Sequence, residues 1–521
     1  MKKPSTFDDL PSAELVITPD IEYTPYKNGM MGITVTMTME TLEGGTKVPI
    51  PSNATVSISL DNGYVIWPTR LPVPITPDDE DSSTGKALFL VVVHDAAKAE
   101  GTVTVSAVAE GVDAQRASVR YTTLDSADVN YVDPSRVVAK TAEPRRADEI
   151  IQFTVKVFQA DQETPAVGYL VNWMQVWDTA LFDAVKAYGS QHALDIDAPL
   201  KIYYRASNNK EGFVLSETDA NGEAHLFLKP TEQPVFFQLR TTADIRSPNT
   251  FQPVIIYGPQ ANFDTTEPDV YAAPDRHLDL DKVTTVGVDA AIEVPDVSSD
   301  SMYLYVFIAN NVVAGSRIFL PGELLNEQIV MSFSKQLVNI TDSKNGNTVF
   351  YVVGERHSGS ARSLPYMFSA SGNKGDNTFP DEGNLDPPSV KYAGTYVNWN
   401  TIDHGLTVVV PFGSEPNLMR PEKHDKLTVT VLLNGWDRNG NERHNSPSQL
   451  ITYDQDAAGD SVEVNFVRAL VSDYGPRPSD GYYDHLYVQY VLTKPDSTIY
   501  KSKIADYRLS TIPIGQRSET E

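Results

Sequence analysis

One stretch indicates the fold most clearly: Thr218-Asp219-Ala220-Asn221-Gly222-Glu223-Ala224-His225-Leu226-Phe227-Leu228. It begins with a turn around Asn221-Gly222, because both residue types tolerate the positive φ that a tight turn requires. After the turn, small or polar side chains alternate with apolar ones, which is the pattern of a β-strand with one buried face. A weaker copy lies at Thr84-Gly85-Lys86-Ala87-Leu88-Phe89-Leu90. Two such copies predict a β-sandwich unit that is used more than once.

The length of 521 residues is too great for one core and indicates roughly three to five domains. Lys and Arg number 42 against 69 Asp and Glu, which gives a formal net charge of −27. Such an excess repels phosphate groups, so nucleic acid is not expected as a partner. No stretch approaches the ~18 continuous apolar residues of a membrane span, and we expect no membrane insertion.

Cysteine is absent, which excludes disulfides, thiolate metal sites and a cysteine nucleophile. The start, Met1-Lys2-Lys3, is basic, but no apolar run follows it, so no signal peptide is visible. We therefore expect an extracellular or cell-surface protein that is exported by an unrecognised route, and the cytoplasm remains an alternative.

Strand patterns and polar linkers divide the chain into four units, at residues 1–126, 127–262, 263–385 and 386–521. The third and fourth units resemble each other. Ile329–Val338 aligns with Val462–Val471, and Val349–Val353 aligns with Val488–Leu492, at separations of 133 and 139 residues. Self-similarity at that period indicates a duplicated domain.

The second unit contains one candidate helix. Trp173, Trp177, Leu181, Val185 and Tyr188 follow one another at spacings of three or four residues, which would place them on one helical face. The segment either caps the end of the sandwich or forms a groove or partner site around its two tryptophans.

The Thr218–Ala224 motif and the Val171-Asn172-Trp173 segment before it resemble the bacterial Ig-like domains of the invasin and intimin group. The third and fourth units resemble a more divergent bacterial Ig-like type. The resemblance implies an all-β fold of tandem Ig-like β-sandwich domains in an elongated array, which act as stalks or adhesive arms. Four sandwiches in a row would make a rod of roughly 120–160 Å.

No His-Glu-x-x-His motif, Walker loop or Gly-x-Ser-x-Gly elbow is present, so we expect no enzyme and assign no catalytic residue. Calcium is the ion that the acidic loops Asp78–Asp81 and Asp437–Glu442 would suit best. Neither loop has EF-hand spacing, and solvated turns are the better account of both. We therefore predict no cofactor and no metal ligand, and leave Ca²⁺ open.

The last unit carries the candidate ligand-binding residues Trp436, Tyr474, Tyr482, Tyr483 and Asp484. Aromatic rings beside carboxylates suit stacking on sugar rings with hydrogen bonds to hydroxyl groups. The alternative is that these aromatics line strand ends and domain joints.

Near the N-terminus, Leu15, Val16 and Ile17 form an apolar stretch that could add as a strand to a neighbour's open sheet edge. We expect a non-enzymatic bacterial extracellular structural or adhesive protein that self-assembles into fibres. Its partners would be itself (as a homo-oligomer or fibre) or a host or cell-surface protein or glycan. The alternative is a carbohydrate-binding or toxin-associated binding module.

Overall fold

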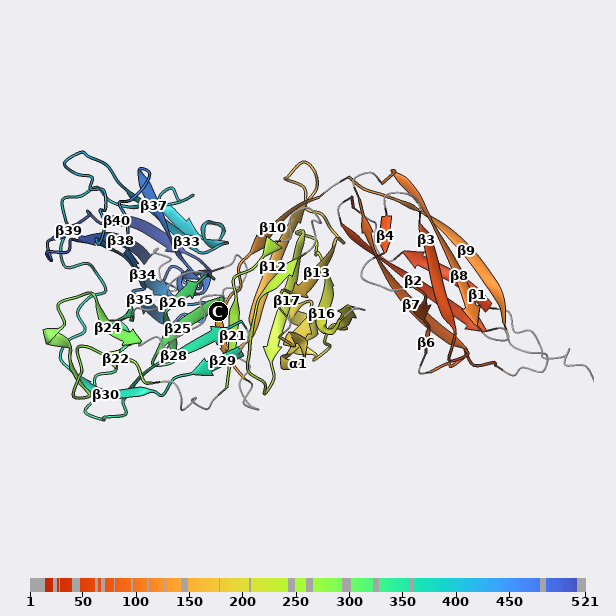
Figure 1. Ribbon diagram of the computed structural model, residues 1–521, viewed down its shortest axis with the longest axis horizontal. Coiled ribbons are helices and arrows are strands. Elements are labelled where there is room, and N and C mark those ends of the chain that lie inside the picture. The colour runs from red at the N-terminus through yellow and green to blue at the C-terminus, as the bar shows by residue number, and fades with distance from the viewer. Residues whose placement is uncertain are drawn as a thin grey trace, which may run out of the picture.

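The chain is all-β in the computed structural model, as the sequence predicts (Figure 1). The helices within the described residues have at most five residues, and none is long and apolar enough to cross a membrane. The structure describes residues 15–21, 26–27, 29–39, 47–60, 64–66, 71–78, 80–94, 97–109, 112–125, 127–141, 149–177, 179–205, 208–241, 249–258, 266–292, 301–321, 328–356, 359–477 and 484–512.

The first sandwich packs two antiparallel sheets around one apolar core. Its strands are β1 (Leu15–Ile21), β2 (Met30–Met39), β3 (Thr55–Leu60), β4 (Tyr64–Ile66), β5 (Val73–Pro74), β6 (Thr76–Pro77), β7 (Thr84–Val93), β8 (Glu100–Ala109) and β9 (Val112–Thr122). Strands β5-β3-β8-β9 form one sheet, and β1, β2, β7, β4 and β6 belong to the other. Ile33, Val35 and Met37 alternate with less buried threonines and are fully buried, which confirms the period of two in this strand.

The second sandwich holds the stretch Thr218–Leu228 with its Asn-Gly turn. Its elements are β10 (Asp128–Val132), β11 (Val138–Lys140), β12 (Ile151–Phe158), β13 (Leu170–Gln175), α1 (Leu181–Ala184), β14 (Val185–Tyr188), α2 (Gln191–Asp195), β15 (Tyr203–Arg205), β16 (Asn208–Glu217), β17 (Glu223–Pro230), β18 (Val235–Phe237), β19 (Leu239–Thr241), β20 (Asn249–Thr250) and β21 (Val254–Tyr257). Strand β17 follows the Asn-Gly turn, as predicted, and lies between β12 and β14. A continuous sheet joins the first two sandwiches, because Leu170 of β13 pairs with Met30 of β2.

The third sandwich has a three-stranded and a larger sheet. Its elements are β22 (Asp269–Val270), β23 (His277–Asp279), η1 (Leu280–Lys282), β24 (Gly287–Ile292), β25 (Tyr303–Ala309), β26 (Val312–Phe319), β27 (Ile329–Ser334), η2 (Lys335–Leu337), β28 (Asn347–Glu355), β29 (Gly359–Arg362) and β30 (Tyr366–Ser371). The small sheet has the order β22-β24-β27, and the large one β23-β30-β28-β25-β26 with β29 beside β28.

The fourth sandwich repeats this order with one exception. Its elements are β31 (Ser389–Val390), β32 (Tyr396–Asn398), η3 (Asn400–Ile402), β33 (Leu406–Pro411), β34 (Lys426–Trp436), β35 (Glu442–Asn445), β36 (Ser448–Thr452), β37 (Ser461–Phe466), α3 (Arg468–Val471), β38 (Asp484–Thr493), β39 (Ile499–Lys501) and β40 (Ala505–Ser510). Two strands, β35 and β36, pair with β34 where the single strand β26 pairs with β25. The orders are β31-β33-β37 and β32-β40-β38-β34-β35. They match the distribution of strands A, B, E and G, F, C, C′ over the two sheets of immunoglobulin-type sandwiches.

The prediction of a helix from Trp173 to Tyr188 in the second unit is mostly wrong. Trp173 lies in β13, Tyr188 lies in β14, and of the described residues between them only the four of α1 are helical. Every residue of β13 is buried, so this strand has no polar face, and the spacing of its apolar residues carries no helical information. Trp173 and Trp177 are 0% and 6% exposed, which leaves no accessible tryptophan groove.

The four sandwiches do not form a single row, so the prediction of a rod of four sandwiches is wrong. The first two lie along the long axis of the molecule, and the third and fourth lie side by side at its other end (Figure 1). Two side-chain amides of the fourth sandwich donate hydrogen bonds to backbone carbonyls of the third: Asn445 to Val313 at 3.3 Å and Gln449 to Ser316 at 3.1 Å. The exact domain boundaries stay a prediction.

Candidate functional site at one end of the fourth sandwich

Three of the residues predicted to bind a ligand, Trp436, Tyr474 and Asp484, lie at the end of the fourth sandwich where β34 ends and β38 begins. Trp436 is the last residue of β34, and Asp484 is the first of β38. Trp436 exchanges two backbone hydrogen bonds with Gly475, at 3.0 and 2.8 Å, which fixes the segment after α3 against this end of the sheet.

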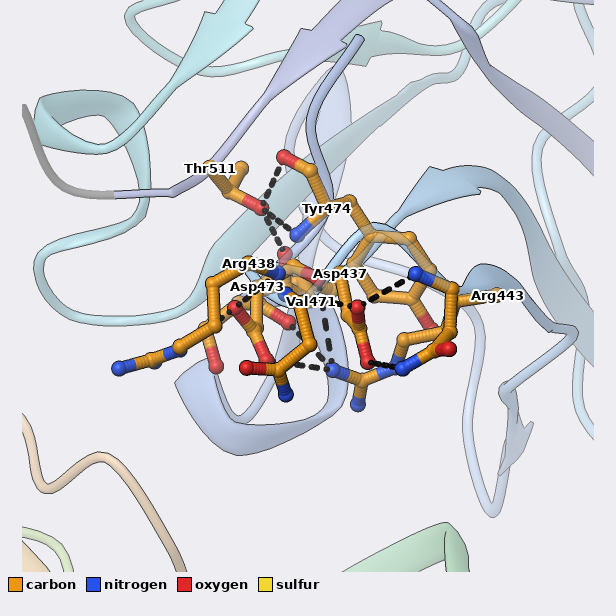
Figure 2. A network of polar contacts seen from close by, with 10 residues as sticks. Asp437, Arg438, Arg443, Val471, Asp473, Tyr474 and Thr511 are labelled. Atoms are coloured by element: carbon orange, nitrogen blue, oxygen red, sulfur yellow. Dashed lines mark hydrogen bonds and ion pairs between the residues drawn. The ribbon is translucent and has the colours of Figure 1, made fainter. Parts of the chain in front are cut away.

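A polar network lies beside Trp436 (Figure 2). The Asp473 carboxylate accepts a hydrogen bond from Arg438 Nε at 3.0 Å and contacts Arg443 Nη1 at 3.5 Å. The Arg443 guanidinium carbon also lies 4.6 Å from the centroid of the Tyr474 ring. One carboxylate thus holds two arginines, and a tyrosine ring supports one of them.

The chain beyond β40 is tied into the same network. The Thr511 hydroxyl donates a hydrogen bond to Val471 O at 2.8 Å and accepts one from Tyr474 N at 3.1 Å. Thr511 N also donates to Tyr474 O at 2.5 Å. Backbone groups that would otherwise be buried without partners are therefore satisfied.

The acidic loop Asp437–Glu442, one of the two loops that were expected to suit calcium, is a turn that is closed by its own hydrogen bonds. Asp437 Oδ1 accepts hydrogen bonds from Asn439 N at 2.9 Å and Asn441 N at 2.8 Å, and Oδ2 accepts one from Asn441 Nδ2 at 3.1 Å. In the other acidic loop, Asp81 pairs with Lys47 and accepts hydrogen bonds from Ser83, which together lower its pKa to about 2. Within the described residues, no three His, Asp or Glu side chains are grouped to hold a metal ion.

The predicted ligand-binding residues have different environments. Tyr474 is fully buried, and burial raises its pKa; the prediction of an accessible ring is wrong for this residue. Trp436 is half-buried, with the Arg477 guanidinium 5.4 Å from its ring centroid, and Asp484 is also half-buried. Tyr482 and Tyr483 lie outside the described residues. A ligand-binding role for Trp436 and Asp484 stays a prediction.

The predicted assembly strand lies in the chain's own first sandwich. Leu15, Val16 and Ile17 of β1 pair with Met39, Thr38 and Met37 of β2 in antiparallel register. Addition to a neighbouring molecule would therefore require β1 to leave its own sheet.

Sequence reasoning missed the role of Arg438, Arg443 and Asp473. One signal was available in the sequence: the motif Asp-x-Asn-Gly occurs at Asp437 as it does at Asp219. Both motifs predict a tight turn that fixes the position of the residues directly after it. The partner Asp473 lies 35 residues away from Arg438, and such a long-range contact follows from the fold alone.

Comparisons with known proteins match this geometry only weakly. No family model matches the sequence, and no curated protein matches it. Among solved structures, the D00-D0 domain of intimin is 12% identical with a TM-score of 0.16, over 47% of this chain and 99% of that one. A Ca²⁺-stabilised, ice-binding adhesin of an Antarctic bacterium is 11% identical with a TM-score of 0.15, over 96% and 99% of the two chains. Tandem Ig repeats of Dlar are 10% identical with a TM-score of 0.19, over 47% and 97%. Scores this low carry no argument, and the fold assignment rests on the sheets themselves.

Proposed function

We propose that this chain is a non-enzymatic structural or adhesive component of a bacterial cell surface, a rigid spacer that positions its ends. The observation that carries the proposal is an apolar cluster that continues through the contacts among the last three sandwiches. Phe236 and Ile255 of the second sandwich, Val306 and Val352 of the third and Val429 of the fourth belong to this one buried cluster, beside the separate cores of the second and third. Units joined by continuous apolar contacts resist bending at their joints, which is what a load-bearing spacer needs.

The structural role of the acidic side chains supports the same proposal. The carboxylates of Asp437, Asp473 and Asp81 hold turns and arginines in place, and each already has its hydrogen-bond partners. Such groups stabilise a scaffold and are poorly placed to transfer protons to a substrate.

In a finer version of the proposal, the chain assembles into fibres through exchange of β1 between copies. Ile17 pairs with Met37 in the chain's own sheet, so an engineered disulfide from Ile17→Cys and Met37→Cys would lock β1 in place. Because the chain has no cysteine, this pair is the only thiol pair present. We expect light scattering and negative-stain images to show oligomers of the reduced variant and of the wild type, and none of the oxidised variant. Oligomers that are unaffected by the lock, or by removal of residues 1–25, would contradict strand exchange.

A second candidate function is glycan binding at the Trp436 end of the fourth sandwich. It is favoured by a half-buried indole beside the exposed Arg477. A glycan array should then give signals that Trp436→Ala removes and that Tyr474→Phe leaves unchanged, because Tyr474 is buried. Absence of any signal would remove this candidate.

A further inference from the structure

The second and fourth sandwiches meet at a buried polar joint that the proposed function does not use. Asp133, directly after β10, donates its backbone N–H to Asp403 O at 2.8 Å. In return, Arg468 Nη1 of α3 donates to Asp133 O at 2.5 Å. These hydrogen bonds link segments that lie about 270 and 335 residues apart in the sequence, so they form only when the two sandwiches are docked.

Several side chains complete this joint. The Arg468 guanidinium carbon lies 3.8 Å from the Trp399 ring centroid, and the ring of Tyr131 lies 4.4 Å from that of His404. Lys156 of β12 pairs with Asp403 at 3.3 Å across the same boundary. Arg468 is 2% exposed, so its charge depends on partners within the joint.

The Asp133 carboxyl group is buried at the centre of the joint, with a 6% exposed side chain. Its Oδ1 accepts a hydrogen bond from Gln252 N at 3.1 Å, and its Oδ2 lies 3.9 Å from His404 Nδ1. Arg468 Nη1 binds the backbone oxygen of this residue. The carboxylate is thus taken out of water with few direct partners, which disfavours its charged form.

We propose that this joint is a proton-dependent latch, which is tightest when the Asp133 carboxyl group is protonated and loosens when that group loses its proton. The latch would couple the pH of the surroundings to the docking of the fourth sandwich on the second, and so to the stiffness of the whole chain.

The direction follows from proton linkage. Burial and, more weakly, Asp403 raise the pKa of Asp133, while the Gln252 amide and Arg468 lower it, and the balance of these effects is a pKa of about 7. In the open joint, the carboxyl group meets water and titrates near its ordinary pKa of about 4. Opening therefore releases a proton between these two pH values, and docking weakens as the pH rises from about 4 to about 7. Above that window both states are ionised and the dependence ends.

The other charged groups of the joint act more weakly or in the opposite direction. Burial lowers the pKa of His404, so opening lets His404 take up a proton below about pH 6.5 and opposes the Asp133 effect there. Arg468, whose pKa burial lowers to about 10, stays charged throughout this range. The net effect of Asp133 is therefore clearest above about pH 6.5, up to the end of its window near pH 7.

Hydrogen exchange at the Asp133 amide tests the latch, because this N–H is bonded across the joint. Exchange rates would be measured by mass spectrometry on the peptide 131–135, at pH 5.5 to 7.5, and corrected for the intrinsic pH dependence of exchange. We expect protection in the wild type to fall by about tenfold over this range. Asp133→Asn mimics the neutral acid and should keep its high protection at pH 7.5.

Two controls make the result specific. Asp195→Asn removes an exposed carboxylate of the same sandwich and should leave the wild-type profile unchanged. His404→Gln removes the opposing group and should steepen the profile. A flat profile in the wild type, or an Asp133→Asn profile that falls in parallel with it, would overturn the proposal.

Discussion

Asp219 and Asp437 show how one residue sets a local structure twice in this chain. Each uses Oδ1 to accept hydrogen bonds from the backbone amides two and four residues later, at 2.8 and 3.0 Å for Asp219 and at 2.9 and 2.8 Å for Asp437. Each turn then places a glycine at positive φ, 74° at Gly222 and 81° at Gly440. A Cβ at Gly222 would also lie 2.4 Å from Val157 O, so only glycine fits there.

Replacement of Asp437 by alanine tests this assignment. Asp437→Ala removes three hydrogen bonds of the turn, and we expect a loss of about 1–2 kcal/mol in the free energy of unfolding. Asp437→Asn keeps an acceptor oxygen and should lose less. Urea denaturation followed by tryptophan fluorescence would measure both. Equal losses in the two variants would show that the negative charge, and not the acceptor geometry, holds the turn.

At the scale of elements, the third and fourth sandwiches share a detail that the strand order alone does not require. Ser363 Oγ accepts from Tyr351 N at 3.0 Å, and Ser502 Oγ accepts from Tyr490 N at 3.1 Å. Each hydroxyl then donates to the next backbone carbonyl, Leu364 O or Lys503 O. The serines are 139 residues apart, which is also the separation of the aligned strands. The third and fourth sandwiches therefore resemble each other even in single hydrogen bonds.

Because both serines are fully buried, their removal should have equal effects. We expect Ser363→Ala and Ser502→Ala each to lower the free energy of unfolding by about 1–3 kcal/mol, since each leaves a buried amide without its partner. Chemical denaturation of the two variants checks this. A large effect in one and none in the other would mean that the two copies have diverged in their packing.

The two copies also pack on each other in a nearly symmetric way. Strand β26 of the third sandwich contacts α3 of the fourth, and β35 of the fourth contacts η2 of the third. Since β26 and β35 are equivalent strands and η2 and α3 follow equivalent strands, the interface resembles that of a two-fold dimer joined into one chain.

Glycine at position 354 of β28 allows the second and third sandwiches to approach closely. A Cβ there would lie 2.4 Å from Phe236 Cδ2 and 2.9 Å from Ile255 Cγ1. We expect Gly354→Ala to force these sandwiches apart and to increase hydrogen exchange in β18 and β21. Gly315→Ala on β26 is the matched control, because its Cβ would meet only Met331 Sδ at 3.4 Å. Unchanged exchange in Gly354→Ala would show that the Phe236 ring can move aside.

At the scale of the whole molecule, the cores predict how the chain unfolds. Three buried clusters lie within single sandwiches, around Phe89 in the first, Phe153 in the second and Phe307 in the third, whereas Phe236 belongs to a cluster that runs from the second and third sandwiches into the core of the fourth. Because this cluster links sandwiches two to four, we expect calorimetry to show a common transition for them and a separate one for the first. Units joined by a large apolar contact unfold together, whereas a unit without such a contact can unfold on its own.

Two variants assign these transitions. Phe89→Ala and Phe236→Ala each remove a fully buried ring and should cost about 3–5 kcal/mol. The first should lower only one transition temperature, and the second should lower only the other. If Phe236→Ala split the common transition into several, the linking cluster would be a contact between independent units.

The sequence by itself determined the strands, the turns and the duplication. Alternation at Ile33, Val35 and Met37 fixes a half-buried strand because the side-chain period of a strand is two, and Asn221-Gly222 fixes the turn before β17 through backbone sterics. These effects act between neighbours in the chain, so local patterns suffice to predict them. The fully buried strand around Trp173 lacks alternation, and there the prediction was wrong.

Only the tertiary structure decided how the sandwiches are placed and which side chains are accessible. Asp133 and Arg468, Asp473 and Arg438, and Gly354 and Phe236 meet across long stretches of sequence. Their docking depends on the fit of whole surfaces, to which many weak contacts contribute and which no local pattern encodes. For the same reason Tyr474 was predicted to bind a ligand but lies in the core, because burial is a property of the assembled sandwich and not of the residue type.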